Sequence, residues 1–340
     1  MSLKTRIRGA LETLSRVFYS GTGAILCLHR VTLPEERSLL PDNRALEITP
    51  DGLEALIRHL QDRRYDIIPL DEVPGALGSR RSRKFIAFTF DDGYLDNLRL
   101  GLPIFRARGV PFAINITTGF VNRSAIAWWH CLEELLGVLE SVKYSDGSRE
   151  YELPLGRLED KHRAFEQLAK QIRNSAQEQR EPFIRSLFSG TGLDPAAISA
   201  RLMMDWDGVR QLAAESLVTI GAHTVTHPTL NLLSPAQLRS ELHDAKIEIE
   251  ARLQRQVRHL AYPFGGPNAV GPREFEAARE CGFVTAATTR TANLFRAHTA
   301  HLHSLPRISI SGNYPIVSRF CSVESGLLTA RIHRFRRVVT

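Results

Sequence analysis

The sequence is poor in cysteine, and its four cysteines form no CxxC pair. It therefore lacks the paired thiols from which many zinc sites and redox motifs are built. All four lie in apolar or mixed surroundings, so we expect buried free thiols without a chemical role. They are Cys27, Cys131, Cys281 and Cys321.

Long apolar runs are also absent, because no stretch of eighteen or more apolar residues occurs in the 340 residues. A membrane-spanning helix is therefore not expected. The first twenty residues, MSLKTRIRGALETLSRVFYS, have neither the apolar stretch nor the small-residue cleavage site of a secretory signal. We expect a protein of the cytoplasm, or one that is peripheral to the inner membrane.

Acidic residues are outnumbered by basic ones, 37 against 44, which leaves a net charge of +7. Residues 1–21 are expected to contain an amphipathic helix, which either packs on the domain or contacts an anionic membrane surface. No nucleic-acid-binding module accompanies the basic residues, so no nucleic-acid partner is expected. No pattern in the sequence indicates an oligomeric state.

Short β-rich apolar runs recur along the chain, with helical segments between several of them. Helices are expected at 51–63, 96–108, 234–256 and 272–281, the third beginning with Ser234 as N-cap and Pro235 at its first position. Strands are expected at 23–29, 84–90, 110–118, 217–223, 258–264, 283–289 and 305–310. This alternation predicts an α/β fold with a parallel sheet, open or closed into a barrel.

One region, residues 124–204, interrupts the alternation. It contains an aromatic helix start, AIAWWHCLEELLGVLE, a predicted hairpin with an Asp146-Gly147 turn, and a charged helix near 157–176. We interpret this region as an insertion between two strands that caps or walls the site. The domain as a whole is assigned to residues 22–340.

The stretch FIAFTFDDG at 85–93 places two carboxylates directly after a predicted buried strand. Neighbouring carboxylates raise each other's pKa unless a cation or hydrogen-bond donors hold them. A surface loop that solvates both Asp91 and Asp92 is the alternative. Gly93 permits a tight exit from the strand.

The stretch GAHTVTHPTL at 221–230 carries two histidines at the end of another predicted strand. If the chain turns helically there, His223 and His227 share one face and can bind one metal ion, although a structural role is an alternative. With Asp92, they form the two-histidine, one-carboxylate set of an open catalytic zinc site. Asp91 would then remain free to take a proton from the metal-bound water.

The stretch AYPFGG at 261–266 ends a third predicted strand. Pro263 and the two glycines predict a turn, which could point the backbone N–H of Phe264 into the site. A tetrahedral intermediate needs such a donor opposite the metal. On its own, a turn of this composition usually has a purely structural role.

Three motifs thus occur in order, each at a strand end: TFDDG at 89–93, HTVTH at 223–227 and YPFG at 262–265. In this order they resemble the polysaccharide deacetylase family, carbohydrate esterase family four, and most closely its branch of biofilm poly-N-acetylglucosamine deacetylase-like enzymes. The resemblance covers about 22–120 and 205–310. It implies a distorted (β/α) barrel of about seven strands, with the site at the carboxyl ends of the strands. It does not explain the mixed helix and hairpin insertion at 124–204.

The resemblance also implies roles for individual residues. Asp91 corresponds to the general base, and the metal ligands correspond to Asp92, His223 and His227. The family's general acid is a histidine. His29, in LCLHRV, matches the pattern of the biofilm branch, and His303, in HLH, is the alternative.

The sequence departs from the family's pattern in two places. Ala261 stands where the family has an arginine that orients the base, and Arg307 could replace that arginine by pairing with Asp91. A plain ion pair of the barrel is the alternative for Arg307. The family's tryptophan motif is only partly matched by MDWDG at 204–208, so Trp206 either lines the site or opens the helix 206–215. Tyr262 is expected beside the substrate.

Together these features predict a metal-dependent hydrolase that removes N-acetyl groups from amino sugars of a polysaccharide or oligosaccharide. Water on Zn²⁺, or on Co²⁺ or Ni²⁺, would attack the acetamide carbonyl, with Asp91 as base and His29 as acid. A deacylase of a lipid-linked or nucleotide-linked sugar is the alternative among hydrolases. A carbohydrate-binding protein on an inactive scaffold is the alternative from another class.

Overall fold

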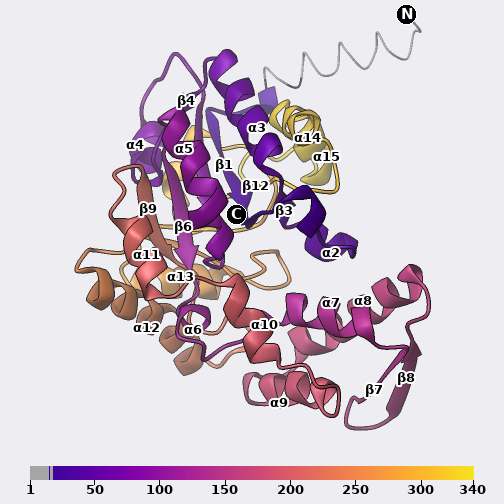
Figure 1. The fold of residues 1–340 in the computed structure, drawn as a ribbon. Helices are drawn as coiled ribbons and strands as arrows, with labels where there is room; N and C mark the ends of the chain where they lie inside the picture. The colour runs from indigo at the N-terminus through magenta and orange to yellow at the C-terminus, as the bar shows by residue number, and fades with distance from the viewer. Residues whose placement is uncertain (1–14, 16–17) are drawn as a thin grey trace, which may run out of the picture.

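The computed structural model describes residue 15 and residues 18–340, which are drawn in colour in Figure 1. The amphipathic helix expected within 1–21, and the membrane contact that depends on it, fall almost entirely outside the described residues. Helices and strands alternate along the rest of the chain, as the sequence pattern predicts. None of the described helices is both long enough and apolar enough to cross a membrane.

A curled parallel sheet lies at the centre of the molecule. Its strands run in the order β12, β1, β5, β6, β9, β10 and β11, and the short β4 (Asp66–Ile67) adds to β5. Beyond β11, Leu305 forms a parallel bridge with Ala287 and the chain then leads into β12. The expected distorted (β/α) barrel of about seven strands is confirmed. Its strands are β1 (Gly23–Leu28), β5 (Phe85–Phe90), β6 (Phe112–Ile116), β9 (Val218–Ala222), β10 (His259–Ala261), β11 (Thr285–Ala287) and β12 (Ile308–Ser309).

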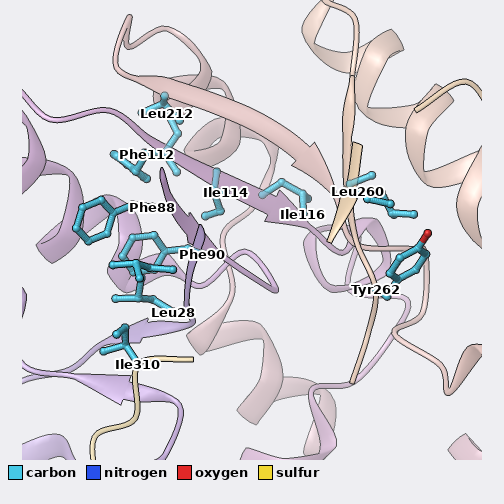
Figure 2. Packing of buried hydrophobic residues seen from close by; sticks show 14 of the residues in the cluster. Leu28, Phe88, Phe90, Phe112, Ile114, Ile116, Leu212, Leu260, Tyr262 and Ile310 are labelled. Atoms are coloured by element: carbon cyan, nitrogen blue, oxygen red, sulfur yellow. The ribbon is translucent and has the colours of Figure 1, made fainter. Parts of the chain in front are cut away.

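Alternation of side chains along each strand decides which residues face the inside of the barrel. All residues of β1 and β5 are buried, as expected for parallel strands that are covered on both faces. In β5, Phe88 packs with the outer helices (Figure 2), whereas Ala87 packs in a separate cluster with Leu305. Every second residue of the strand has its side chain on this inner face, so Ala87 is followed there by Thr89 and then by Asp91. The alternation of the strand therefore places the Asp91 side chain inside the barrel.

Helices cover the outside of the sheet (Figure 1). One of them begins as predicted at Ser234, whose side chain forms a capping box with Gln237. The segment expected as one helix over 96–108 is divided, because a π-helical turn, η3 (Asn97–Gly101), precedes the α-helix. Pro103 has no N–H to donate, which interrupts regular α-helical bonding there. The helices are α3 (Pro50–Asp62), α5 (Leu102–Arg108), α11 (Trp206–Ala213), α12 (Pro235–Leu253) and α13 (Pro272–Glu280).

Between β6 and β9 the chain forms a group of helices and a hairpin, at the lower right of Figure 1. The helices have a hydrophobic cluster of their own, which includes Trp128 and Leu168. The predicted hairpin is present, and the side chain of Asp146 accepts hydrogen bonds from the N–H groups of Ser148 and Arg149 in its turn. The elements are α6 (Thr118–Val121), α7 (Trp128–Val138), β7 (Ser141–Ser145), β8 (Glu150–Pro154), α8 (Leu158–Asn174), α9 (Gln177–Phe188) and α10 (Pro195–Leu202).

Shorter elements complete the described chain. The pair β2 and β3 lies just after β1 and frames a short helix, α2, that faces the inserted helices. Two helices, α14 and α15, end the chain. The remaining bounds are β2 (Arg30–Val31), η1 (Pro34–Glu36), α2 (Pro41–Arg44), β3 (Glu47–Ile48), η2 (Leu70–Glu72), α4 (Val73–Gly78), η4 (Leu230–Leu232), η5 (Arg296–Ala300), α14 (Ile316–Glu324) and α15 (Leu327–Ile332).

Candidate metal centre and active site

A fully buried arginine holds the carboxylate of Asp91 inside the barrel. Arg307 donates from Nη1 to Oδ1 at 2.9 Å and from Nη2 to Oδ2 at 2.7 Å. The guanidinium is itself fixed, since Nε donates to the carbonyl of Thr288 and Nη1 also reaches the hydroxyl of Thr89. Such a two-point pair sets the orientation of a carboxylate as well as its charge.

Two further side chains contact Asp91, and the sequence pattern had not indicated either of them. Nδ2 of Asn115 donates to Oδ1 at 2.8 Å, and Sγ of Cys27 lies 3.5 Å from Oδ2. An amide in the middle of the apolar strand FAINI is a signal that could have identified Asn115. Cys27 offers no comparable signal. All four cysteines are free, as expected, but Cys321 is only partly buried.

Asp92 contacts a different set of side chains. Its Oδ1 lies 3.4 Å from Nε2 of His223 and 3.4 Å from Nε2 of His227. One ligand atom from each residue lies within 4.8 Å of those of the other two, and all three residues are buried. The three side chains therefore meet at one point, at the carboxyl ends of β5 and β9.

The spacing of the two histidines suggested a helical turn between them. The structure has no helix there, so another arrangement brings the two side chains together. The chain after β9 is irregular, and Thr224 and His227 have left-handed backbone angles, with φ of 67° and 55°. Glu241 of α12 ties this loop down, because its carboxylate accepts hydrogen bonds from the N–H groups of the two residues after Thr224. The loop thus returns His227 to His223, with ring centroids 5.0 Å apart.

Left-handed backbone angles, which are uncommon outside glycine, recur at this site. Besides Thr224 and His227, Asp92 has a φ of 75° and Phe264 a φ of 59°. Such angles cost about 1–3 kcal/mol each and persist only where the surrounding structure holds them. Strained residues of this kind cluster at functional sites, and here they include two of the candidate ligands.

Burial opposes ionisation of both carboxylates, but their neighbours outweigh it. The charge of Arg307 holds the pKa of Asp91 well below its usual range, and the two histidines lower the pKa of Asp92. Burial lowers the pKa of His227 to about 3, whereas the carboxylates outweigh burial at His223 and raise its pKa. Ionised Asp92 and neutral His227 are the protonation states that metal binding requires.

The donor atoms fit a divalent ion. Within the described part of the chain, Oδ1 of Asp92 and Nδ1 of His227 are buried and have no hydrogen-bond partner. Nδ1 of His223 lies 2.7 Å from the carbonyl oxygen of Ala261, which leaves Nε2 as its ligand atom. A buried carboxylate oxygen without a donor is costly unless a cation faces it. These residues could therefore hold a divalent ion in an open site.

The site opens into a cavity of about 340 Å³. This volume is near the lower end of the range for small-ligand cavities, about 300–1,000 Å³. Most of the predicted site residues line the cavity, namely His29, Asp91, Asp92, His223, His227, Tyr262 and Phe264.

Phe264 and Tyr262 line the cavity in different ways. The N–H of Phe264 forms no hydrogen bond with any described residue, so it is available to a ligand. Its ring packs edge-on against His227, with centroids 4.9 Å apart. The hydroxyl of Tyr262, in contrast, donates to the carbonyl of His303 at 2.8 Å and is already engaged.

The two candidate acids occupy different places. His29 follows β1 and lines the cavity, and a ring nitrogen lies within 4.8 Å of the Asp91 carboxylate. Burial lowers the pKa of His29, although both neighbouring carboxylates act in the opposite direction. His303 does not line this cavity, and its Nε2 lies 2.8 Å from the carbonyl oxygen of Phe283. Position therefore favours His29.

Trp206 lies away from the cavity. It is the first residue of α11, and Asp205 caps that helix by accepting a hydrogen bond from the N–H of Gly208. The indole Nε1 donates to Asn122 at 2.7 Å, and the guanidinium of Arg252 lies over the ring. Of the two readings of MDWDG, the contacts of Trp206 support the helix start.

The inserted helices supply part of the cavity wall. Trp128 and Trp129 come from α7, and Phe165 and Arg173 come from α8. On the barrel side, Nδ2 of Asn43 in α2 donates to the carbonyl of Trp129. The sequence predicts only that the Trp-Trp pair begins a helix, because nothing in the local sequence indicates which way the two side chains face.

Solved structures share this fold at low sequence identity. The deacetylase PplD from Streptococcus pyogenes, solved with acetate, is 19% identical with a TM-score of 0.56, over 87% of this chain and 96% of that one. IcaB from Ammonifex degensii is 17% identical with a TM-score of 0.56, over 90% and 98% of the chains. The BpsB deacetylase domain from Bordetella bronchiseptica is 15% identical with a TM-score of 0.52, over 85% and 96%.

Sequence comparison identifies the family. A search of curated proteins finds no match. A model of the polysaccharide deacetylase family, however, matches residues 78–286, which is more than half of the chain and includes all three motifs. The protein therefore belongs to the polysaccharide deacetylase family, carbohydrate esterase family four, as the order of those motifs predicted.

Proposed function

We propose that this protein is a metal-dependent hydrolase that removes N-acetyl groups from amino sugars of a polysaccharide or oligosaccharide. Membership of the polysaccharide deacetylase family supports the hydrolytic class of the reaction. The observation that best supports the proposal is that two neighbouring carboxylates have different partners. Asp91 is paired with Arg307, whereas Asp92 faces His223 and His227.

Asp92, His223 and His227 are the proposed metal ligands. A divalent ion bound there would act as a Lewis acid, polarising the acetamide carbonyl and acidifying the attacking water. Zn²⁺, Co²⁺ and Ni²⁺ all suit this ligand set, and availability decides among them as much as affinity does. The buried Oδ1 of Asp92 supports the assignment, because it has no hydrogen-bond partner in the described part of the chain and faces both histidines.

Asp91 is the proposed general base. One carboxylate oxygen takes a proton from the attacking water as the new bond to the acetyl carbon forms. Arg307 keeps the carboxylate in a fixed orientation through two hydrogen bonds, and Asn115 adds a third. Arg307 thereby has the positioning role that the family gives to an arginine in its third motif.

Phe264 and His29 complete the proposed reaction. The backbone N–H of Phe264 donates to the negative oxygen that develops from the acetamide carbonyl. His29 gives a proton to the sugar nitrogen as the bond between that nitrogen and the acetyl carbon breaks. The products are acetate and the free amino sugar.

Replacing Asp91 by Asn tests the proposal. Acetate release from chitooligosaccharides or poly-N-acetylglucosamine should fall about 100- to 10,000-fold, the usual effect of losing a general base. The metal content should stay unchanged, because Asp91 is not a proposed ligand. Asp207→Asn, which alters an exposed carboxylate on α11, is the control and should keep full activity. Full turnover by a folded, metal-loaded D91N protein would show that Asp91 is not the base.

A further inference from the structure

The two candidate metal-binding histidines are held in different ways. A histidine that binds a metal usually donates its second ring N–H to a carbonyl, a carboxylate or water, and this bond fixes the ring. His223 follows the rule, since its Nδ1 lies 2.7 Å from the carbonyl oxygen of Ala261. Nδ1 of His227 is buried and has no such partner in the described part of the chain. Something other than a hydrogen bond must therefore orient His227.

Besides His223, three aromatic rings pack around His227. Phe264 packs edge-on with centroids 4.9 Å apart, Trp129 lies at 5.0 Å and an angle of 52°, and Phe120 stacks at 5.9 Å. Phe120 and Phe264 follow β6 and β10 of the barrel. Trp129 is different, because it belongs to α7, one of the inserted helices.

Trp129 is itself held firmly in place. Its Nε1 donates to the hydroxyl of Tyr94 at 2.9 Å, and that hydroxyl also lies 3.0 Å from Nε2 of His130. Its carbonyl accepts a hydrogen bond from Asn43 of α2. Trp129 is therefore anchored through both its indole ring and its backbone carbonyl. A ring fixed in this way can restrict the rotation of an imidazole that packs against it.

We propose that Trp129 is a positioning residue for the metal ligand His227, so that the inserted helices complete the metal site of the barrel. Packing against the indole takes the place of the hydrogen bond that orients His223. The inference rests on the metal site of the proposed function. It adds that the site depends on a side chain outside the three family motifs.

Binding of Co²⁺ to the purified full-length protein tests this inference without an activity assay. Trp129→Ala should weaken Co²⁺ binding about 10- to 100-fold, the usual effect of losing a group that orients a ligand. It should also change the visible absorption spectrum of bound Co²⁺, because His227 can then rotate. Trp129→Phe keeps an aromatic ring at this place and should restore most of the affinity and the wild-type spectrum.

Leu132→Ala is the matched control. Leu132 is a buried residue of the same helix and the same hydrophobic cluster, and it does not line the cavity. The L132A protein should bind Co²⁺ as the wild type does. Wild-type affinity and spectrum in W129A would overturn the inference. An equal loss in L132A would also overturn it, because it would indicate general loosening of the helices.

Two further points keep the result decisive. If W129A does not fold, Trp129→Leu, which retains much of the volume but no ring, is judged by the same criteria. Circular dichroism of the metal-free proteins establishes folding in each case. Failure of the wild type to bind Co²⁺ would refute the metal site of the proposed function, whereas wild-type binding by the variants would refute only the role of Trp129.

Discussion

Asn115 and Gly221 are register partners in the paired strands β6 and β9. A β-carbon on Gly221 would lie 2.2 Å from Oδ1 of Asn115, which is too close for the two to coexist. The missing side chain at 221 therefore makes room for the amide that donates to Asp91. The requirement is steric, because φ of Gly221 does not lie in the left-handed region.

Gly221→Ala should therefore reduce activity by displacing Asn115 from Asp91. Misplacing a reacting group by about 1 Å can lower the rate about 100-fold, so we expect kcat to fall about 10- to 100-fold when the proposed base loses this contact. Asn115→Ala should have a similar effect, and the double variant should add little, because both changes remove the same contact. Gly137→Ala, where a β-carbon would meet no atom within 4 Å, is the control for the steady-state assay. Equal kcat in G221A and G137A would contradict the argument.

Arg307→Ala should destabilise the fold. It leaves Asp91 buried without its countercharge, and breaking a buried pair in this way costs about 3–5 kcal/mol of unfolding free energy. Arg307→Lys should recover only part of the loss, because an ammonium cannot form the two-point pair. Arg279→Ala removes an exposed pair with Glu276 and should cost far less, because solvent screens such a pair. Urea denaturation of the three variants measures these differences, and equal values for the two alanine variants would count against the buried pair.

His29→Ala and His303→Ala should separate the two candidate acids. His29 lines the cavity, and loss of a general acid lowers the rate about 100- to 10,000-fold. His303 lies outside the cavity, so its replacement should leave kcat near the wild-type value. Both variants are compared in the acetate-release assay at the same metal loading. The reverse ranking would assign the acid to His303.

Removal of the metal should lower stability as well as activity. An ion that binds only the folded protein adds about 2.7 kcal/mol of stability when its concentration is 100 times its dissociation constant. The melting temperature of the wild type should therefore fall after chelation and recover when Zn²⁺ is returned. Asp92→Ala removes a proposed ligand and should make melting much less sensitive to Zn²⁺. If neither chelation nor added Zn²⁺ changes the melting temperature of the wild type, the result argues against a metal site.

Asp96 should make stability depend on pH. Burial raises its pKa to about 6, even though Arg30 donates to it at 2.8 Å. The unfolded-state pKa is about 3.9, so folding favours the protonated form. Its contribution is therefore complete below about pH 4 and is lost as the pH rises through about 6. The difference in unfolding free energy between wild type and Asp96→Asn should change over this interval in urea denaturation. A constant difference would show that Asp96 does not titrate there.

Local sequence patterns were sufficient for most of the fold. Strands such as β5 are buried on both faces and appear as continuous apolar runs, so they can be recognised without their neighbours. The start of α12 was predictable because its cap, Ser234, bonds to a residue only three positions away. The turn at 223–227 was not, because its shape depends on Glu241 of α12 and on Arg180 of α9.

The sequence by itself determined the barrel, the family and the residues of the three motifs, because each motif is a short segment that ends a recognisable strand. Tertiary structure alone decided how those segments cooperate: the pairing of Arg307 with Asp91, the position of His29 in the cavity, and the contact of Trp129 with His227. Asp91 and Arg307 are 216 residues apart, so the resemblance to a family offered their pairing only as one possibility and no local pattern established it. Only closure of the barrel brings such residues within hydrogen-bonding reach.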